Sequence, residues 1–173
     1  MTISSLTKKA ALSLALATAA MSSAHASQHD IQLWANVDPT LDLRKADGTP
    51  LWDTVRLTYS PGVGLDRWSQ NVRIHTNDPD NDVEVRLGFN PTLTLRGDAS
   101  TSVPLTVKLN DENLSTDPTR FTADMLFPGG LDSGTSISMP LSISQTTTGE
   151  LASAGNYQGA VSIVMVQRDP IVP

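Results

Sequence analysis

Residues 156–167, Asn-Tyr-Gln-Gly-Ala-Val-Ser-Ile-Val-Met-Val-Gln (NYQGAVSIVMVQ), close the chain with one of its most apolar segments. The alternation of its residues is typical of a β-strand and puts five of them on one face: Tyr157, Gly159, Val161, Ile163 and Met165. Such an apolar strand is expected near the centre of a sheet. Only six residues follow it, Pro170 and Pro173 among them, so we expect that the chain itself supplies no strand beyond it.

The same alternation recurs along the chain at intervals of about ten residues. Turn signals at 47–50 and 61–64 separate the strands expected at 41–46, 53–60, 67–76, 82–88, 103–109 and 135–144. In the last of these, apolar residues are expected to point inward and serines outward. Pro104 indicates an edge strand or a bulge, and Pro140 an edge strand, because proline cannot donate to a ladder. Residues 119–127 fit either a helical turn or a strand. The pattern as a whole predicts an all-β sandwich.

The first 26 residues have the features of a secretory signal peptide. Lys8 and Lys9 precede an apolar run from Ala10 to Ala20, and a small-residue site, Ala-His-Ala, ends at Ala26. The apolar run is too short to span a bilayer. We therefore predict an exported protein whose mature part begins near Ser27 and forms a single domain of ordinary size.

The mature part is acidic. Without Lys8 and Lys9, the 12 basic residues of the chain become 10 against 18 acidic ones, a net charge of −8. This balance disfavours nucleic acids and anionic lipids, both of which attract clustered lysine and arginine.

The sequence has little that resembles an active site or a metal site. There is no cysteine, which excludes disulfides, thiolate ligands and cysteine nucleophiles. The mature part has two histidines, His29 and His75; His75 is expected to face solvent, and neither has a zinc-site spacing. The run at 131–135 lacks the first glycine of a G-x-S-x-G elbow. The run from Asp78 lacks the later glycine and glutamate of a calcium loop. We predict no enzyme activity, cofactor or metal.

The other end of the mature chain carries a well-patterned strand that directly precedes the domain. In residues 29–39 (HDIQLWANVDP), four apolar residues alternate with polar ones or Trp34: Ile31, Leu33, Ala35 and Val37. One end of the chain therefore lacks a strand and the other has one to spare. The physical alternatives are insertion of this strand into the same domain and insertion into a neighbouring subunit. The second is a head-to-tail contact, which builds open filaments.

Several runs resemble the major pilins of class 5 fimbriae, the coli-surface-antigen type assembled by the alternate chaperone–usher pathway, with cable pilin as a relative. These runs are VDPTLDL (37–43), ADG (46–48), LTYSP (57–61), HTND (75–78) and AGNYQGAVSIVM (154–165). The resemblance spans about Ile31 to Met165 and is weakest from Arg96 to Ser136.

The resemblance implies an incomplete immunoglobulin-like β-sandwich, residues 40–173, completed by a donor strand, residues 27–39, from a neighbouring subunit. The inserted residues would be Ile31, Leu33, Ala35 and Val37, and the acceptor groove would be lined by Tyr157, Val161, Ile163 and Met165, with its other wall unassigned. Pro39, at the junction, is a hinge that sets the angle between subunits in this hypothesis.

The resemblance also implies a structural, adhesive fimbria on the bacterial surface, reached through the periplasm. Identical subunits, a periplasmic chaperone, an outer-membrane usher and a tip adhesin would be its partners, and a host-cell receptor is a further possibility. The alternative is a secreted β-sandwich binding module, such as a minor or tip adhesin or a carbohydrate-binding domain. An exported hydrolase is disfavoured by the small number of histidines.

Overall fold

A computed structural model describes residues 41–129 and 134–170, and nearly all of their regular structure is antiparallel β-sheet. The larger sheet has the order β1-β4-β10-β7-β6-β11, and β8 also pairs with β7. Its strands are β1 (Leu41–Lys45), β4 (Trp68–Thr76), β10 (Met139–Gln145), β7 (Asp98–Leu109), β6 (Thr92–Leu95), β11 (Tyr157–Gln158) and β8 (Glu112–Leu114).

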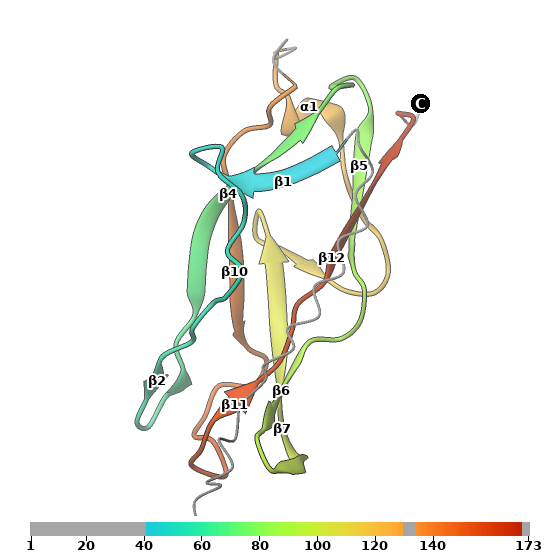
Figure 1. The fold of residues 1–173 in the computed structure, drawn as a ribbon. Helices are drawn as coiled ribbons and strands as arrows, with labels where there is room; N and C mark the ends of the chain where they lie inside the picture. Colours follow the sequence, from blue (N-terminus) through green and yellow to red (C-terminus); the bar gives the residue numbers. More distant parts are fainter. Residues whose placement is uncertain (1–40, 130–133, 171–173) are drawn as a thin grey trace, which may run out of the picture. The chain divides into compact units, whose positions relative to one another are not determined.

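The second sheet has three strands in the order β12-β5-β9, and Figure 1 shows β12 alongside β5. Its strands are β12 (Ile163–Arg168), β5 (Asp82–Leu87) and β9 (Thr119–Phe121). A two-stranded hairpin joins β2 (Tyr59–Ser60) to β3 (Gly64–Leu65). The described residues contain no helix that is long and apolar enough to cross a membrane.

A single hydrophobic core contains side chains from both sheets. The larger sheet contributes every second residue of its strands, as the period of a strand requires: Val72, Ile74, Val107, Leu109 and Met139 are all fully covered. The smaller sheet contributes Val83, Val85 and Phe121. The short helix α1 (Ala123–Leu126), whose first turn is capped by Thr122, adds Leu126. The sandwich expected from the alternating pattern is therefore present.

Three of the expected elements differ from those in the structure. Within 53–60 only Tyr59 and Ser60 pair with another strand, and of the expected face Val55 and Leu57 are half-buried while Tyr59 is exposed. Residues 119–127 form both a strand, β9, and the helix α1. The apolar run 156–167 is divided into β11 and β12 by an unpaired stretch, and β12 is an edge strand rather than a central one.

The expectation that Pro104 and Pro140 mark edge strands is wrong, because β7 and β10 both lie inside the larger sheet. The β10–β7 ladder runs between the pairs Leu141–Leu109 and Gln145–Leu105, and each proline lies one residue beyond one of its ends. Each proline carbonyl still accepts a hydrogen bond, from Thr146 or Asn110, at 3.0 and 2.9 Å. The two prolines therefore terminate a ladder without interrupting it.

The serines of 135–144 are not all exposed. Ser142 lies on the outer face of β10 as expected, but both it and Ser136 are buried. Ser136 Oγ accepts a hydrogen bond from the Ile74 amide at 2.8 Å and donates to the Ile137 carbonyl. Ser142 Oγ accepts from the Arg67 guanidinium at 3.0 Å. A buried serine with such partners carries little desolvation cost.

His75 is also less exposed than expected. It does lie on the outward face of β4, but Thr135 covers it, with its hydroxyl 3.2 Å from His75 Nδ1. The other ring nitrogen, Nε2, is buried and has no hydrogen-bond partner among the described residues. The segment leading into β10, rather than solvent, therefore borders this histidine.

Candidate functional site

The free edge of β12 is the first element of the candidate site. Ile163 and Met165 stand opposite Leu87 and Val85 of β5, so their side chains face the core. Leu87 and Val85 are 2% and 0% exposed, whereas Ile163 and Met165 remain only half-buried although they pack against the same core. Among the described residues, β12 pairs with no strand other than β5. The sandwich is thus open along this edge.

The segment from Leu51 to Leu57 is the second element. Val55 and Leu57 are half-buried while Thr54 and Arg56 between them are exposed, which is the pattern of a strand with one face on a core. Leu51 and Leu57 pack against the hydrophobic core. Within the described residues, no backbone group from 51 to 57 makes a hydrogen bond. This segment is strand-like in its side chains and lacks a ladder partner.

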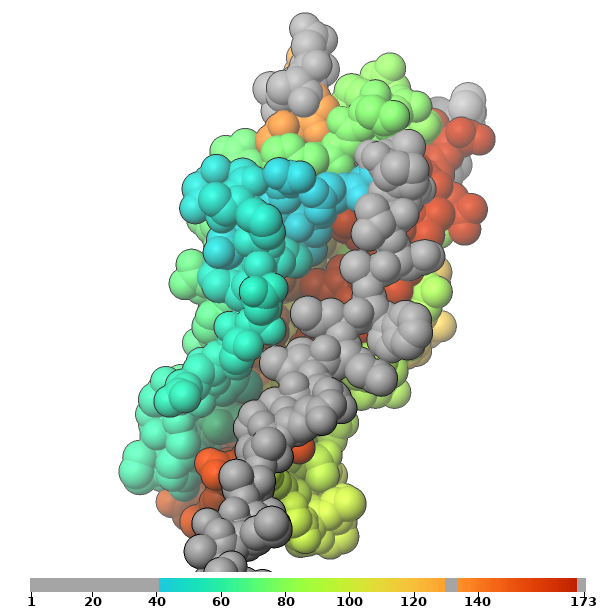
Figure 2. All heavy atoms as spheres, in the orientation of Figure 1, coloured from blue at the N-terminus to red at the C-terminus, as the bar shows by residue number. Residues whose placement is uncertain are grey.

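A cavity of about 630 Å³ lies between the 54–59 segment and residues 151–157. Both apolar and polar groups line it, including Val55, Leu57, Leu65, Leu93 and Tyr157. The Tyr157 hydroxyl donates to the Ser153 carbonyl at 2.8 Å, which holds the ring at the cavity wall. In Figure 2, the residues after β1 and those of β12 lie on the face turned towards the viewer. The cavity is large enough to admit bulky apolar side chains.

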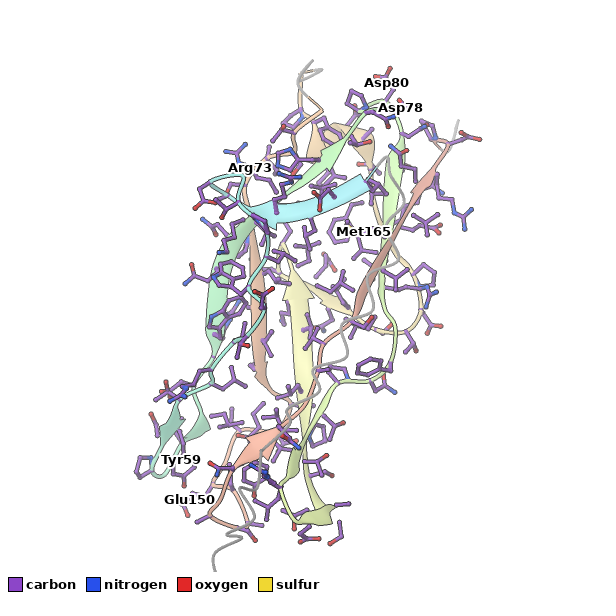
Figure 3. All side chains as sticks on the ribbon, viewed as in Figure 1. Tyr59, Arg73, Asp78, Asp80, Glu150 and Met165 are labelled. Carbon is purple, nitrogen blue, oxygen red and sulfur yellow. The ribbon has the colours of Figure 1, made fainter. Side chains whose placement is uncertain are left out.

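The far end of β12 is fastened to β9 and to the loop that follows β4. The buried carboxylate of Asp82 accepts hydrogen bonds from Arg120 Nε at 2.7 Å and from the Ala123 amide at 2.8 Å. Arg120 also donates to the carbonyl of Asp169, just beyond β12. The Gln167 amide group donates to the carbonyl of Asp78 at 3.1 Å. Figure 3 shows Met165 on β12, between this fastened end and the end of the sandwich where Tyr59 and Glu150 lie. The open edge is therefore held in position although it is unpaired on one side.

The residues expected to line a groove occupy different positions along this edge. Tyr157 is in β11, paired with Leu95, and lines the cavity. Val161 is in the unpaired stretch after β11 and packs against the core. Ile163 and Met165 are the core-facing residues of β12. The positions Ile31, Leu33, Ala35, Val37 and Pro39 lie outside the described residues.

Sequence reasoning missed the opposite side of this opening. Val55 and Leu57 carry the alternation of the strand expected at 53–60, and nothing in the pattern shows that this segment has no ladder partner among the described residues. Side-chain alternation reports which face meets a core, but not whether the backbone has a neighbour.

Among the described residues, neither a metal centre nor a set of paired catalytic side chains is evident at this site. In residues 41–129 and 134–170, no group of three or more histidine, aspartate or glutamate side chains is placed to hold a metal ion. In the run at 78–83, the Asp78 carboxylate instead accepts a hydrogen bond from the side-chain amide of Asn81 at 2.8 Å, as in a polar turn.

Comparison with known proteins identifies the family to which this chain belongs. The family model for the CS1 type fimbrial major subunit matches residues 27–166. A CS1 fimbrial subunit of Escherichia coli is 36% identical over 166 residues, covering 92% of this chain and 97% of that protein. A CFA/I fimbrial subunit of Escherichia coli O78:H11 is 37% identical over 147 residues, covering 83% of this chain and 86% of that protein.

Two solved structures share the fold. The CooA pilin subunit from enterotoxigenic Escherichia coli superposes with a TM-score of 0.67 at 33% identity, over 75% of this chain and 88% of that one. A chain of the chaperone–tip adhesin complex of CFA/I fimbriae superposes with a TM-score of 0.52 at 15% identity, over 75% of this chain and 43% of that one. At that identity the second match bears on the fold alone.

Proposed function

The chain belongs to the CS1 type fimbrial major subunit family, and we propose that it polymerises by donor-strand complementation. It is a structural subunit of a chaperone–usher fimbrial shaft and not an enzyme. In the proposal, residues 27–39 of one subunit lie between β12 and the 51–57 segment of the next. The observation that carries the proposal is the edge of β12 at Ile163 and Met165, which pairs with no second strand among the described residues and leaves these core-facing side chains only half-buried.

The pattern of the extension suits this opening. Ile31, Leu33, Ala35 and Val37 recur every second residue, so in an extended chain all four face the same way. The backbone of an inserted strand would pair with the free edge of β12 and with the unpaired groups of 51–57. Tyr157 and Val161 would line the groove together with Ile163 and Met165. Burying an isoleucine, a leucine and a valine contributes about 1.5–3 kcal/mol each.

The energetic consequence is large for a domain of this size. The side chains of one inserted strand contribute an amount comparable with the whole stability of a small domain, about 5–15 kcal/mol. A subunit without a donor strand should therefore be barely stable, and one with it robust. This would let the domain dispense with disulfides despite export.

Assembly requires helpers and a defined geometry. A periplasmic chaperone would cover the groove until an outer-membrane usher exchanges it for the extension of the next subunit, with a tip adhesin at the end of the fibre. Pro39 would act as the hinge between extension and domain. A Pro39→Ala fibre with unchanged pitch and stiffness in electron micrographs would remove that role.

The proposal is tested on the domain from residue 40 onward, purified without its extension. A peptide covering Asp30 to Asp38 should raise its melting temperature by about 10 °C or more, since 1 kcal/mol corresponds to about 2–8 °C in domains of this range. The same peptide with Leu33→Asp should have no effect. A trimmed domain that is already heat-stable and indifferent to the peptide would contradict donor-strand complementation.

A second test uses cells that express the full chain with its chaperone and usher. Electron microscopy should show fibres with the wild-type chain and none with the Leu33→Asp chain. Fibres that persist in the variant would show that assembly uses another contact.

A further inference from the structure

The turn between β6 and β7 carries the tripeptide Arg96-Gly97-Asp98. Strand β6 ends at Leu95 and β7 begins at Asp98, so Arg96 and Gly97 are the two residues of the turn itself. All three residues of the tripeptide are exposed. Figure 1 shows this turn at the same end of the sandwich as β2 and β11, opposite the end with α1. The tripeptide is thus presented at a tip.

The turn is held on both sides, which fixes how the tripeptide is displayed. The Arg96 amide donates to the Asn156 carbonyl at 2.8 Å, tying the turn to the segment before β11. Gly97 has a φ of +92°, a conformation that favours glycine, and no other atom lies within 4 Å of the place of a β-carbon there. A binding partner can therefore approach the backbone closely. Because the turn is already ordered, little conformational entropy would be lost on binding.

The two charged side chains of the tripeptide do not pair with each other. Asp42 and Arg44 have the same spacing on β1 and form an ion pair with 2.6 Å between Arg44 Nε and Asp42 Oδ2. Arg96 and Asp98 form none, and within the described residues the Arg96 guanidinium makes no hydrogen bond or ion pair. Its five donors remain available to a carboxylate in a partner.

Asp98 is held in its ionised form. Oδ1 accepts hydrogen bonds from the Ser100 hydroxyl at 2.6 Å and the Ser100 amide at 3.0 Å, and Oδ2 accepts from the Thr101 hydroxyl at 2.6 Å. The Ser100 hydroxyl, followed by the Thr101 hydroxyl, lowers the pKa of Asp98 to about 2. A carboxylate has about four lone-pair positions, so three donors leave capacity for a metal ligand.

We propose that this turn is a receptor-binding site of the fimbrial shaft, read by an adhesion receptor of the integrin class. Such a receptor binds an Arg-Gly-Asp loop in two places: a divalent cation held by the receptor takes the aspartate carboxylate, and an acidic pocket takes the guanidinium. The turn supplies both groups unpaired with each other, on an ordered tip. This goes beyond fibre assembly, and it is testable on single chains.

Assembly would strengthen the binding without changing its chemistry. Each subunit of a fibre carries one copy of the turn, and linked copies raise the effective concentration of the second and later contacts. A weak contact per subunit would thus suffice for attachment of a cell.

The experiment immobilises the mature full chain with the Asp30 to Asp38 peptide present, checks by circular dichroism that it is folded, and measures binding of a purified integrin ectodomain of the Arg-Gly-Asp-binding class by surface plasmon resonance in Mn²⁺ buffer. Binding should vanish with EDTA and compete with free Arg-Gly-Asp-Ser peptide but not with Arg-Gly-Glu-Ser. Arg96→Ala and Asp98→Glu should each weaken it at least about tenfold, because the first removes a charge-assisted contact and the second shifts the carboxylate by one methylene away from the cation. Asp42→Glu, a change outside the turn, should bind as the wild type does.

Absence of wild-type binding, binding that survives EDTA, or wild-type affinity in Arg96→Ala would overturn the proposal. The Arg96→Ala result decides the matter if Asp98→Glu lowers the melting temperature, since the Arg96 side chain supports no contact in the described fold. Because the measurement does not need fibres, a failure here is distinct from a failure of donor-strand complementation, which the peptide experiment reports.

Discussion

Ile163 of β12 lies directly opposite Leu87 of β5 in an antiparallel pair, and the two side chains face the same core. Only 2% of the surface of Leu87 is exposed, whereas Ile163 is only half-buried. Neighbours on one sheet face normally share their burial. Among the described residues β5 has a strand on each side and β12 only on one, which agrees with this difference in burial.

Met165 provides a direct test of that opening. Met165→Asn puts an amide on the core face of β12, where an inserted strand would bury it without a partner. The peptide of Asp30 to Asp38 should then give less than half of its wild-type rise in melting temperature, about 5 °C or less in place of about 10 °C. Differential scanning fluorimetry measures this.

Val166→Asn is the matched control, because Val166 is next in the strand and stands opposite Glu84 on the other face. It should retain the full response to the peptide. Equal losses in the two variants would mean that the peptide does not bind on the core face of β12.

The Asp82–Arg120 pair should be important for stability. Asp82→Ala removes the acceptor of Arg120 Nε and of the Ala123 amide, which leaves a part-buried cation and an unsatisfied helix amide. Removing one partner of a buried pair costs about 3 kcal/mol or more. Urea denaturation of the peptide-complemented domain should show this loss.

Glu84 gives the comparison. Its pair with Arg168, 2.9 Å between Nε and Oε2, is largely exposed on the arginine side. Glu84→Ala should cost less than about 1 kcal/mol. A cost in Asp82→Ala as small as that in Glu84→Ala would show that the buried pair does not fasten the end of β12.

Asp98 should titrate at unusually low pH. Its pKa in the folded chain, about 2, is below its ordinary value of 3.8. A lowered pKa stabilises the fold above the ordinary value, and this contribution disappears as the pH falls from about 4 through about 2. Ser100→Ala removes the hydroxyl that contributes most, so the pKa of Asp98 should rise towards its ordinary value. Carboxyl ¹³C NMR titration measures the change.

Asp47 serves as an internal reference in the same titration. Hydrogen bonds from the Thr49 hydroxyl and amide lower the pKa of Asp47, and Ser100→Ala leaves them in place. The Asp47 titration should therefore not move. An unchanged Asp98 titration in Ser100→Ala would mean that the hydroxyl does not hold the carboxylate.

Alanine substitutions at Gly64 and Gly48 distinguish the cost of backbone strain from the cost of a steric clash. Both have positive φ, +103° and +84°, so alanine is strained at either position. A β-carbon on Gly64 would lie 2.1 Å from the Gly149 carbonyl oxygen, whereas nothing lies within 4 Å at Gly48. We expect Gly48→Ala to cost about 1 kcal/mol and Gly64→Ala at least about 3 kcal/mol in thermal or urea unfolding. Equal costs would show that the loop at 149 moves away from β3.

The sequence alone was sufficient for the class of fold, because alternation with period two reports directly which side chains meet a core. Val83, Val85 and Leu87 were expected inside, as were Val72 and Ile74, and all five are buried. The resemblance to fimbrial subunits also came from the sequence, through local runs at the two ends of the mature chain, and the family match agrees with it.

Prolines, serines and His75 were harder to place because each depends on a neighbour that is distant in the chain. Pro104 and Pro140 are compatible with interior strands only because each lies just beyond a ladder end formed with residues some 30 to 40 positions away. Ser136 is buried only because the Ile74 amide needs its oxygen. Side-chain type does not report such partners.

The sequence by itself determined that strands would form and which faces would be apolar, whereas the donor strand at residues 27–39 stays a prediction. Only the tertiary structure decided which edge is left open, because that depends on the pairing of backbone groups between segments far apart in the chain. The alternation of Val55 and Leu57 is the same whether or not a ladder partner exists. Within the described residues, the lack of a second partner for β12 and of a ladder for 51–57 is a property of the assembled sheets and of no single run of residues.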